Sequence, residues 1–342
     1  MHKIKKILVL AMLAVFVFSL AACGGGQSQQ PSSSEGSQSS SGETSGEKTL
    51  RVAMLVSGPV NDGGWNQSAY EGLKLIEREL GAEIAFTEKV QQADQANIMR
   101  DYARKGYDLI IGHGFEYSDT LLQIAEEFPD TKFVGVGTKV TAPNLAALQF
   151  NVGELGHLVG IVVSQVTKSN KIGIVAGMDT PTGKAEFDNI IEVTKKINPK
   201  AEVVTAYTNS WEDVPKAKEA ALAQIASGVD VIVANGDACN LGVIQAAKEK
   251  GIQVVGWTGD QHDLAPDNVL TSAVQRVDKM MLIAAQELKN GTFEGKIYNL
   301  GLKDGVQYMG TYNDKVPEEL RQQVEKEAQG IIDGTVQIKT GF

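Results

Sequence analysis

The sequence has few cysteines and no concentrated basic segment, and these two absences exclude several classes of protein. Cys23 and Cys239 are its only cysteines in 342 residues, which excludes a disulfide-rich secreted scaffold. The net charge is −10 at pH 7, and no stripe of lysine and arginine offsets it. We therefore expect no nucleic-acid partner.

Motifs for catalysis and for metal or cofactor binding are also missing. None of the 4 histidines has the spacing to another histidine or to a cysteine that a zinc site needs. Gly58–Gly64 is rich in glycine but lacks the Lys-Ser/Thr ending of a phosphate-binding loop, and Val134–Gly137 is too short for a dinucleotide-binding motif. "GDQHD" at Gly259–Asp263 brings acids near His262 without a Ser or Cys nucleophile. We expect neither an enzyme nor a cofactor nor a metal site.

Long apolar runs are scarce, and the one at the start of the chain indicates export. Ile7–Phe18 follows three lysines and has the length of a signal-peptide core rather than of a membrane span. Leu20-Ala21-Ala22-Cys23 resembles a bacterial lipobox. We expect residues 1–22 to be a signal peptide and Cys23 to carry a lipid that anchors the chain to a membrane. An ordinary secretory signal and an N-terminal transmembrane anchor are the alternatives.

The next segment has the composition of a linker. Residues 24–48 are almost entirely Gly, Ser, Gln and Glu, without apolar periodicity. A flexible chain of this length spans about 25–30 Å. With Cys23 lipidated, Cys239 has no disulfide partner and is interpreted as a small buried apolar side chain.

From Thr49 onward, apolar strand-like runs alternate with helix-like stretches. Predicted strands are Leu50–Val56, Asp108–Ile111, Lys132–Val136, Leu145–Phe150, Lys171–Ala176, Ala201–Ala206, Val229–Ala234, Ile252–Gly256 and Val269–Val274. Predicted helices are Asn66–Leu80, Ala93–Lys105, Ser118–Phe128, Gly153–Thr167, Asp213–Ser227 and Ala238–Lys250. This alternation predicts parallel sheets with helices on both faces.

A weak internal duplication favours two α/β lobes over one large sheet. "YARKGYDLIIGHG" is paralleled by "QIASGVDVIVANG", and each half has a tryptophan shortly after a predicted strand, at Trp65 and Trp211. Ligands of open α/β sheets bind at the carboxyl ends of the strands. The two rings can enclose a flat ligand between the lobes, or each can merely cover a helix end.

Several segments, in this order, resemble the basic membrane protein family of bacterial lipoproteins. They are "NDGGWNQSAYEGLK", "YDLIIGHGFEYSD", "SWEDVPKAKEAALAQIASGVDVIVANG", "GVIQAAKEKGIQVVGW" and "DNVLTSAVQRVD". The resemblance implies a solute receptor of an ABC transporter that binds purine nucleosides or related bases. It also implies a two-lobed periplasmic-binding fold of type I, with three crossovers between the lobes.

The resemblance also implies positions for these crossovers, near Gln149–Asn151, Val274–Gln275 and Gly295–Ile297. The first lobe would then comprise residues 49–149 and 275–295, and the second lobe residues 150–274 and 296–342.

The resemblance implies a binding site formed first by two aromatic residues and the polar residues beside one of them. Trp65 and Trp211 fall where the family usually has phenylalanines that stack on the base. Asp62 and Asn66, beside Trp65, are implied to bind the base edge by hydrogen bonds.

Four further positions complete the implied site. Asp260 would bind ribose hydroxyls, Asp119 matches a family acid in a loop, and Asp237 would lie at the cavity lip. Gln275 stands where nucleoside binders often carry a lysine that contacts the sugar. A neutral amide still donates to a hydroxyl but is not a cation. A free purine base is therefore the alternative ligand.

The implied partners are the permease and ATPase subunits of the transporter. We expect a monomer held by its lipid on the extracytoplasmic face of the cell membrane, at a Gram-positive surface. A ligand-sensing lipoprotein without a transport role is the second alternative.

Overall fold

The computed structural model describes residues 48–62 and 64–339, which belong to one compact unit beginning at Lys48. The expected signal peptide, Cys23 and nearly all of the expected linker lie outside the described residues. Within the described part, no helix combines the length and the apolar character that a membrane crossing requires.

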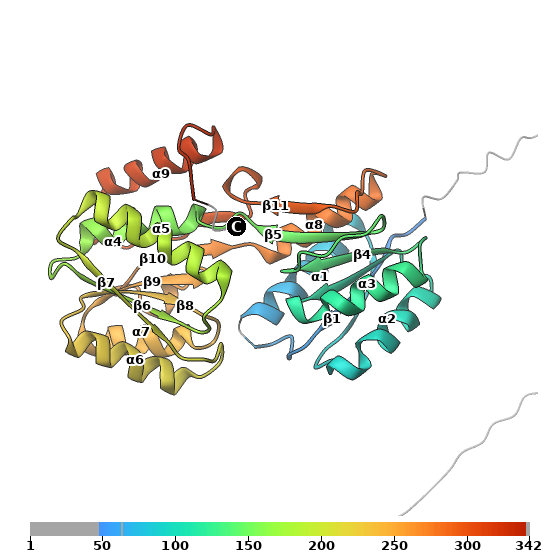
Figure 1. Cartoon of the computed structure of the whole chain (residues 1–342), viewed down its shortest axis with the longest axis horizontal. Helices are drawn as coiled ribbons and strands as arrows, with labels where there is room; N and C mark the ends of the chain where they lie inside the picture. Colours follow the sequence, from blue (N-terminus) through green and yellow to red (C-terminus); the bar gives the residue numbers. More distant parts are fainter. Residues whose placement is uncertain (1–47, 63, 340–342) are drawn as a thin grey trace, which may run out of the picture. The chain divides into compact units, whose positions relative to one another are not determined.

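The first lobe is built on a six-stranded sheet in the order β11-β5-β4-β3-β1-β2, with all neighbouring strands parallel. Its strands are β1 (Arg51–Val56), β2 (Glu83–Thr87), β3 (Leu109–His113), β4 (Lys132–Val136), β5 (Leu145–Phe150) and β11 (Ile297–Leu300). Its helices are α1 (Trp65–Leu80), α2 (Gln95–Arg104), α3 (Ser118–Glu127) and α8 (Val277–Lys289), with the 3-10 turns η1 (Gln92–Asp94) and η2 (Phe115–Tyr117) (Figure 1).

Alternate side chains of β1 divide the core of this lobe into two layers. Val52 and Met54 pack with α1 and α8 on one face of the sheet, whereas Ala53 and Leu55 pack with α2 and α3 on the other. A strand covered on both faces must be apolar along its buried length, which is why Val52–Val56 of β1 is a continuous apolar run.

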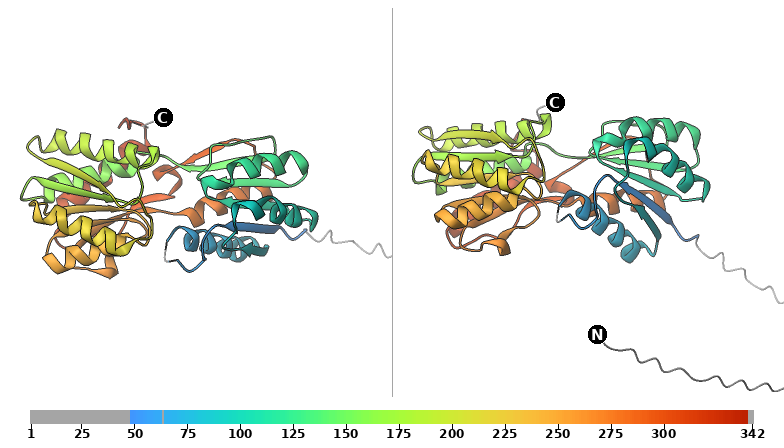
Figure 2. Two further views of the ribbon diagram at one scale, coloured as in Figure 1. Left: turned by 60° about the horizontal axis from the view of Figure 1, so that its bottom comes forward. Right: turned by 90° about the horizontal axis from the view of Figure 1, so that it is seen from below.

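The second lobe repeats this architecture on a sheet in the order β12-β10-β9-β8-β6-β7. Its strands are β6 (Lys171–Ala176), β7 (Glu202–Tyr207), β8 (Val231–Asn235), β9 (Gln253–Thr258), β10 (Val269–Gln275) and β12 (Gln307–Met309), of which only β12 is antiparallel to its neighbour in the described sheet. Its helices are α4 (Glu154–Val166), α5 (Pro181–Ile197), α6 (Val214–Ala226), α7 (Asn240–Lys250) and α9 (Glu318–Ile332), with the 3-10 turns η3 (His262–Leu264) and η4 (Leu302–Asp304). Figure 2 shows the two lobes from two further directions.

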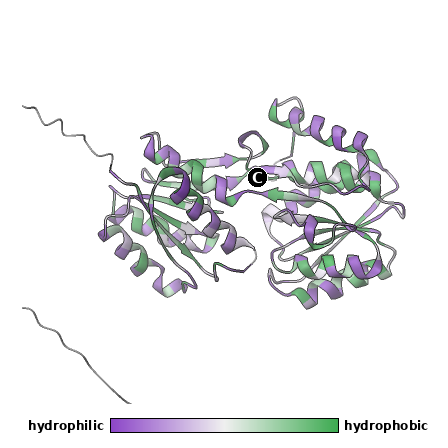
Figure 3. Ribbon diagram, turned by 180° about the vertical axis from the view of Figure 1, so that it is seen from behind, coloured by the Kyte–Doolittle hydropathy of each residue, from purple (hydrophilic) through white to green (hydrophobic). Residues whose placement is uncertain are grey.

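The two sheets confirm the duplication that the sequence indicates. β2-β1-β3-β4-β5 and β7-β6-β8-β9-β10 have the same order, and the paired segments noted above form β3 and β8, the third strands of the two series. Helices that cover these sheets carry both hydrophobic and hydrophilic residues, whereas the strands are mainly hydrophobic (Figure 3).

Two local features of the sequence have the expected structural roles: the apolar spacing within α1 and the aspartate before α6. Ala69, Leu73 and Ile76 form the buried face of α1, as their spacing predicts. The side chain of Asp213 caps α6 by accepting a hydrogen bond from the backbone N–H of Lys216 at 3.0 Å. Cys239 is buried among apolar side chains of the second lobe.

The third crossover differs from its expected position. Ile297–Leu300 forms β11, which pairs parallel with β5 at the edge of the first sheet. The chain therefore leaves the first lobe after Leu300, not near Gly295–Ile297, and residues 297–300 lie in the first lobe, not the second. A four-residue edge strand has too short a pattern to be recognised, because its place is set by pairing with β5.

Candidate functional site

A cavity of about 680 Å³ lies between the two lobes, lined by loops that follow the strands of both sheets. This volume lies within the usual range for small-molecule sites, and the carboxyl ends of parallel strands are where such sites form. Five of the expected site residues line it: Trp65, Asn66, Trp211, Asp237 and Gln275.

Trp65 is the first residue of α1 and is held from one side by His113, at the end of β3. The two rings are stacked, with centroids 4.3 Å apart and planes at 29°. His113 Nε2 lies 3.0 Å from the backbone oxygen of Trp65. Burial lowers the pKa of His113 to about 4 against the opposing effect of that hydrogen bond, so the imidazole is neutral at pH 7. A fixed indole with a neutral ring behind it is suited to stacking on a flat ligand.

Trp211 belongs to the opposite lobe, in the loop between β7 and α6. Its ring lies directly over Gly177, where an added Cβ would be 2.3 Å from the ring. The residue nevertheless remains 38% exposed. Sequence reasoning missed Phe115, which also lines the cavity and is 76% exposed. Large apolar side chains left open to solvent beside a cavity favour a ligand that covers them.

Asp62 lies near the cavity but does not line it, because its carboxylate caps α1. It accepts hydrogen bonds from the backbone N–H groups of Gly64 at 2.9 Å, Asn66 at 3.0 Å and Gln67 at 2.9 Å. It also accepts from Asn66 Nδ2 at 2.7 Å. Asp62 thus compensates for Gly64, the N-cap residue, which has no side chain to do so.

Asp237, in the loop after β8, connects the two lobes directly. Both of its carboxylate oxygens accept from the backbone N–H of Trp65, at 2.9 and 3.0 Å. Burial, opposed by that hydrogen bond and reinforced by the charges of Asp62 and Glu212, raises the pKa of Asp237 to about 7.

Asp62, Glu212 and Asp237 bring carboxylate oxygens within 4.8 Å of one another. Among the described residues this is the group with ligand atoms close enough to hold a metal ion. Carboxylate oxygens are ligands for hard cations such as calcium.

Two expected site residues are placed elsewhere. Asp119 lies in the first turn of α3 and does not line the cavity. Asp260, also outside the lining, accepts from the backbone N–H of Thr311 at 2.9 Å and from its hydroxyl at 2.7 Å. Partial burial raises the pKa of Asp260, but these hydrogen bonds outweigh it and leave the pKa lowered. Asp260 thereby ties the loop after β9 to the segment after β12.

Glu186 of α5 is a cavity residue that sequence reasoning missed. It is only 4% exposed, and its Oε2 accepts from the backbone N–H of Gly156, at the start of α4, at 2.7 Å. Burial raises the pKa of Glu186 to about 7, although hydrogen bonds from Gly153 and Gly156 act in the opposite direction. The pair Thr180-Pro181, an N-cap followed by proline, was the signal that could have located α5 and hence Glu186.

Replacing Glu186 with glutamine is expected to flatten the dependence of stability on pH. The folded protein holds the Glu186 proton more tightly than an ordinary carboxyl of pKa 4.5 would. The resulting stabilisation is fully present below the ordinary pKa and is lost as the pH rises through about 7. Between about pH 5 and pH 8, the free energy of unfolding of the wild type should fall by about 1–3 kcal/mol more than that of Glu186→Gln. Urea unfolding at several pH values measures this difference, and parallel curves for the two proteins would contradict it.

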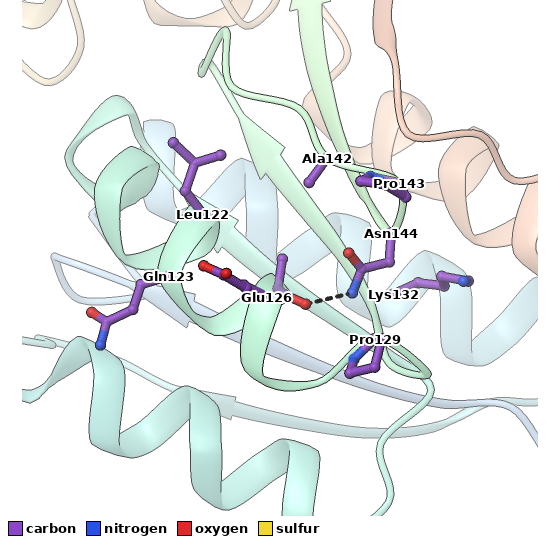
Figure 4. Close-up of a pocket in the computed structure, with 9 residues that line it drawn as sticks. Leu122, Gln123, Glu126, Pro129, Lys132, Ala142, Pro143 and Asn144 are labelled. Carbon is purple, nitrogen blue, oxygen red and sulfur yellow. Dashed lines mark hydrogen bonds between the residues drawn. The ribbon is translucent and has the colours of Figure 1, made fainter.

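A second cavity, of about 580 Å³, is formed by the first lobe alone. Figure 4 shows its lining from α3 and the segment around β4 and β5. Asn144 Nδ2 donates a hydrogen bond to the backbone oxygen of Ala125 at 3.0 Å. No aromatic side chain is among its described lining residues. The cavity between the lobes is therefore the better candidate for the functional site.

Comparisons with known proteins agree with this architecture. The chain is 33% identical to the transcriptional activator protein Med of Bacillus subtilis over 82% of this chain and 87% of that protein. It is 28% identical to a purine-binding protein of Brucella abortus over 88% of this chain and 86% of that protein. A solved ABC transporter solute-binding protein from Conexibacter woesei matches with a TM-score of 0.73 and 26% identity, over 86% of this chain and all (100%) of that one.

The likeness to this solved solute-binding protein confirms the expected two-lobed type I architecture. The family model described as "ABC transporter substrate-binding protein PnrA-like" matches residues 49–341, which confirms the resemblance found in the sequence. This chain belongs to the Bmp family of PnrA-like ABC transporter substrate-binding proteins.

Proposed function

We propose that this protein captures a purine nucleoside between its lobes and delivers it to the permease of an ABC importer. The observation that carries the proposal is that Trp65 and Trp211, from opposite lobes, line the same cavity. The purine-binding relative from Brucella abortus supports the ligand class.

The mechanism begins with a purine that stacks on one indole while the lobes are apart. Closure then brings the second indole and the polar side chains of Asn66 and Gln275 to the ligand. The hydrogen bonds between Asp237 and the N–H of Trp65 would then hold the two lobes together. A ligand stabilises the closed form only to the extent that it binds that form better than the open one. The closed form is the one that the permease would recognise.

The position of Asp260 alters how the sugar would be held. Because Asp260 is engaged by Thr311 and lies outside the lining, ribose recognition would depend on Gln275 and its neighbours. A free purine base therefore remains the alternative ligand.

Calorimetric titration of residues 24–342 with adenosine, guanosine, inosine and the corresponding free bases tests the ligand class. We expect saturable 1:1 binding of at least one nucleoside. Tight binding of a sugar or an amino acid, with no response to any purine, would refute the proposal. Mass spectrometry of the small molecule that co-purifies with the protein provides an independent test.

We further propose that lipid on Cys23 anchors a monomer to the extracytoplasmic face of the cell membrane. The lipobox-like residues 20–23 and the polar segment after them support this proposal. Globomycin, which inhibits the lipoprotein signal peptidase, should cause the unprocessed precursor to accumulate.

A sensory role without transport is the second candidate, and the similarity to an activator protein favours it. A deletion strain decides between the two roles. Loss of uptake of labelled nucleoside indicates transport, whereas normal uptake with altered transcription indicates sensing.

A further inference from the structure

We propose that the cavity between the lobes selects a flat heterocycle that carries a positive charge and rejects phosphorylated ligands. This inference rests on the proposed function, because it takes that cavity as the binding site. It goes further by assigning the charge of the ligand.

The charged side chains among the described residues that line the cavity are all acidic. Glu116, Glu186, Glu212 and Asp237 line it, and no lysine, arginine or histidine does among the described lining residues. A charge that is taken out of water is stable only when it is paired. An anionic ligand would add repulsion here, whereas a cation would supply the pairing.

Two basic side chains near the lining, Arg276 and His113, do not supply that pairing. Arg276 follows Gln275 in sequence, but its guanidinium donates two hydrogen bonds to Asp278, at 2.7 and 2.6 Å. His113 lies behind Trp65, and burial lowers its pKa to about 4, so it is uncharged at pH 7.

Helix N-termini at the cavity could attract an anion, but carboxylates of the protein already occupy two of them. Asp62 and Asp237 accept from the first N–H groups of α1, and Glu186 accepts from the N–H of Gly156 in the first turn of α4. At the start of α5, the Thr180 side chain accepts from the N–H of Gly183 at 3.1 Å. At these three helix ends, the usual binding positions for a phosphate are therefore filled.

These helix ends compensate the carboxylates only in part. Burial raises the pKa of Glu186 to about 7 despite its hydrogen bonds to backbone N–H groups. A cationic ligand would stabilise the ionised form of Glu186 and release protons on binding.

The aromatic side chains fit the same ligand class. Trp65, Trp211 and Phe115 line the cavity together with the acids. The face of an aromatic ring attracts cations, most strongly for tryptophan, and the attraction increases when the cation is desolvated. The combination of indole faces with carboxylates that have no basic side chain beside them in the described lining favours a delocalised cation over a neutral ring of the same shape.

Two pairs of ligands, each differing in the position of one methyl group and in charge, test the proposal by calorimetry at pH 7. 1-Methyladenosine is cationic, whereas N6-methyladenosine has the same skeleton and is neutral. 1-Methylnicotinamide and N′-methylnicotinamide form an equivalent pair on a different ring. We expect the cation to bind at least about tenfold more tightly in one or both pairs, and adenosine 5′-monophosphate to bind at least about tenfold more weakly than adenosine.

Glu212→Gln provides the matched variant, because Glu212 lines the cavity from an exposed loop where the substitution leaves the core intact. It should reduce the ratio of cation to neutral affinity by about three- to tenfold. The control, Glu219→Gln, changes an exposed acid of α6 outside the lining and should leave the ratio unchanged. Calorimetry in two buffers with different heats of ionisation measures proton release on binding. Binding of the cation should release protons from the protein, whereas binding of the neutral ligand should not.

The proposal is overturned if the neutral ligand binds as tightly as the cation in both pairs. It is also overturned if adenosine 5′-monophosphate binds as tightly as adenosine. Failure of the purine assignment gives a different result. In that case adenosine and both of its methyl derivatives do not bind, while the nicotinamide pair still reports whether the cavity prefers positive charge.

Discussion

Trp211→Ala should weaken purine-nucleoside binding by roughly 5- to 150-fold, the equivalent of about 1–3 kcal/mol for one ring stacked on a base. The ring is 38% exposed in the structure and rests on Gly177 at the cavity. Its removal therefore leaves little unfilled space in the core. We expect the melting temperature of the ligand-free protein to change little, and calorimetry together with thermal unfolding measures both quantities.

Trp65→Ala should weaken binding to a similar extent but also lower stability. Trp65 is only partly exposed, stacks on His113 and packs against the core of the first lobe. Phe86→Ala is the matched control, because Phe86 is a 39% exposed aromatic residue of β2 outside the cavity. If Trp211→Ala binds as the wild type does, or unfolds outright, its ring does not stack on the ligand and the purine proposal loses its main support.

Glu154→Ala should destabilise the protein by about 3 kcal/mol, the expected effect of leaving buried hydrogen-bond donors without an acceptor. Glu154 is 8% exposed and connects two crossovers between the lobes. Its Oε1 accepts from Asn151 Nδ2 at 2.9 Å, and its Oε2 accepts from the backbone N–H of Leu302 at 2.8 Å. With the Gln307 amide oriented so that its nitrogen faces Glu154, a third donor lies 3.1 Å away.

Chemical denaturation measures this effect as a lower midpoint with an unchanged slope. Glu126→Ala, at an exposed position of α3, is the control and should remain within about 0.5 kcal/mol of the wild type. If Glu154→Ala lowered the free energy of unfolding no more than the control does, water would replace the carboxylate and other contacts would hold the crossovers.

The central elements of the fold could be predicted because their apolar periodicity is local. The strands β1, β3 and β8 are apolar at nearly every position, and α1 shows one apolar face. The edge strands β2, β11 and β12 were not predicted. They are three to five residues long, and each owes its place to hydrogen bonds with a distant strand.

The candidate site was predicted in part. Trp65, Asn66, Trp211, Asp237 and Gln275 line one cavity, and each follows a predicted strand closely in the sequence. Asp62 and Asp260 have the same residue type as Asp237 and also lie in loops after strands, yet they are outside the lining. Their carboxylates accept hydrogen bonds from backbone N–H groups within their own lobes. A carboxylate in a loop can bind a ligand or satisfy the backbone, and residue type alone does not distinguish the two.

The sequence by itself determined the alternation of strands and helices, the division into two similar halves and the family, because these depend on patterns within short segments. Only the tertiary structure decided that Glu186 and Phe115 enter the cavity, that Asp62 and Asp260 do not, and that basic side chains are missing from the described lining. The reason is that side-chain direction in a loop, and the groups that face it from the other lobe, depend on contacts between residues far apart in the chain. Asp237 and Trp65, joined by hydrogen bonds across 172 positions, show such a contact.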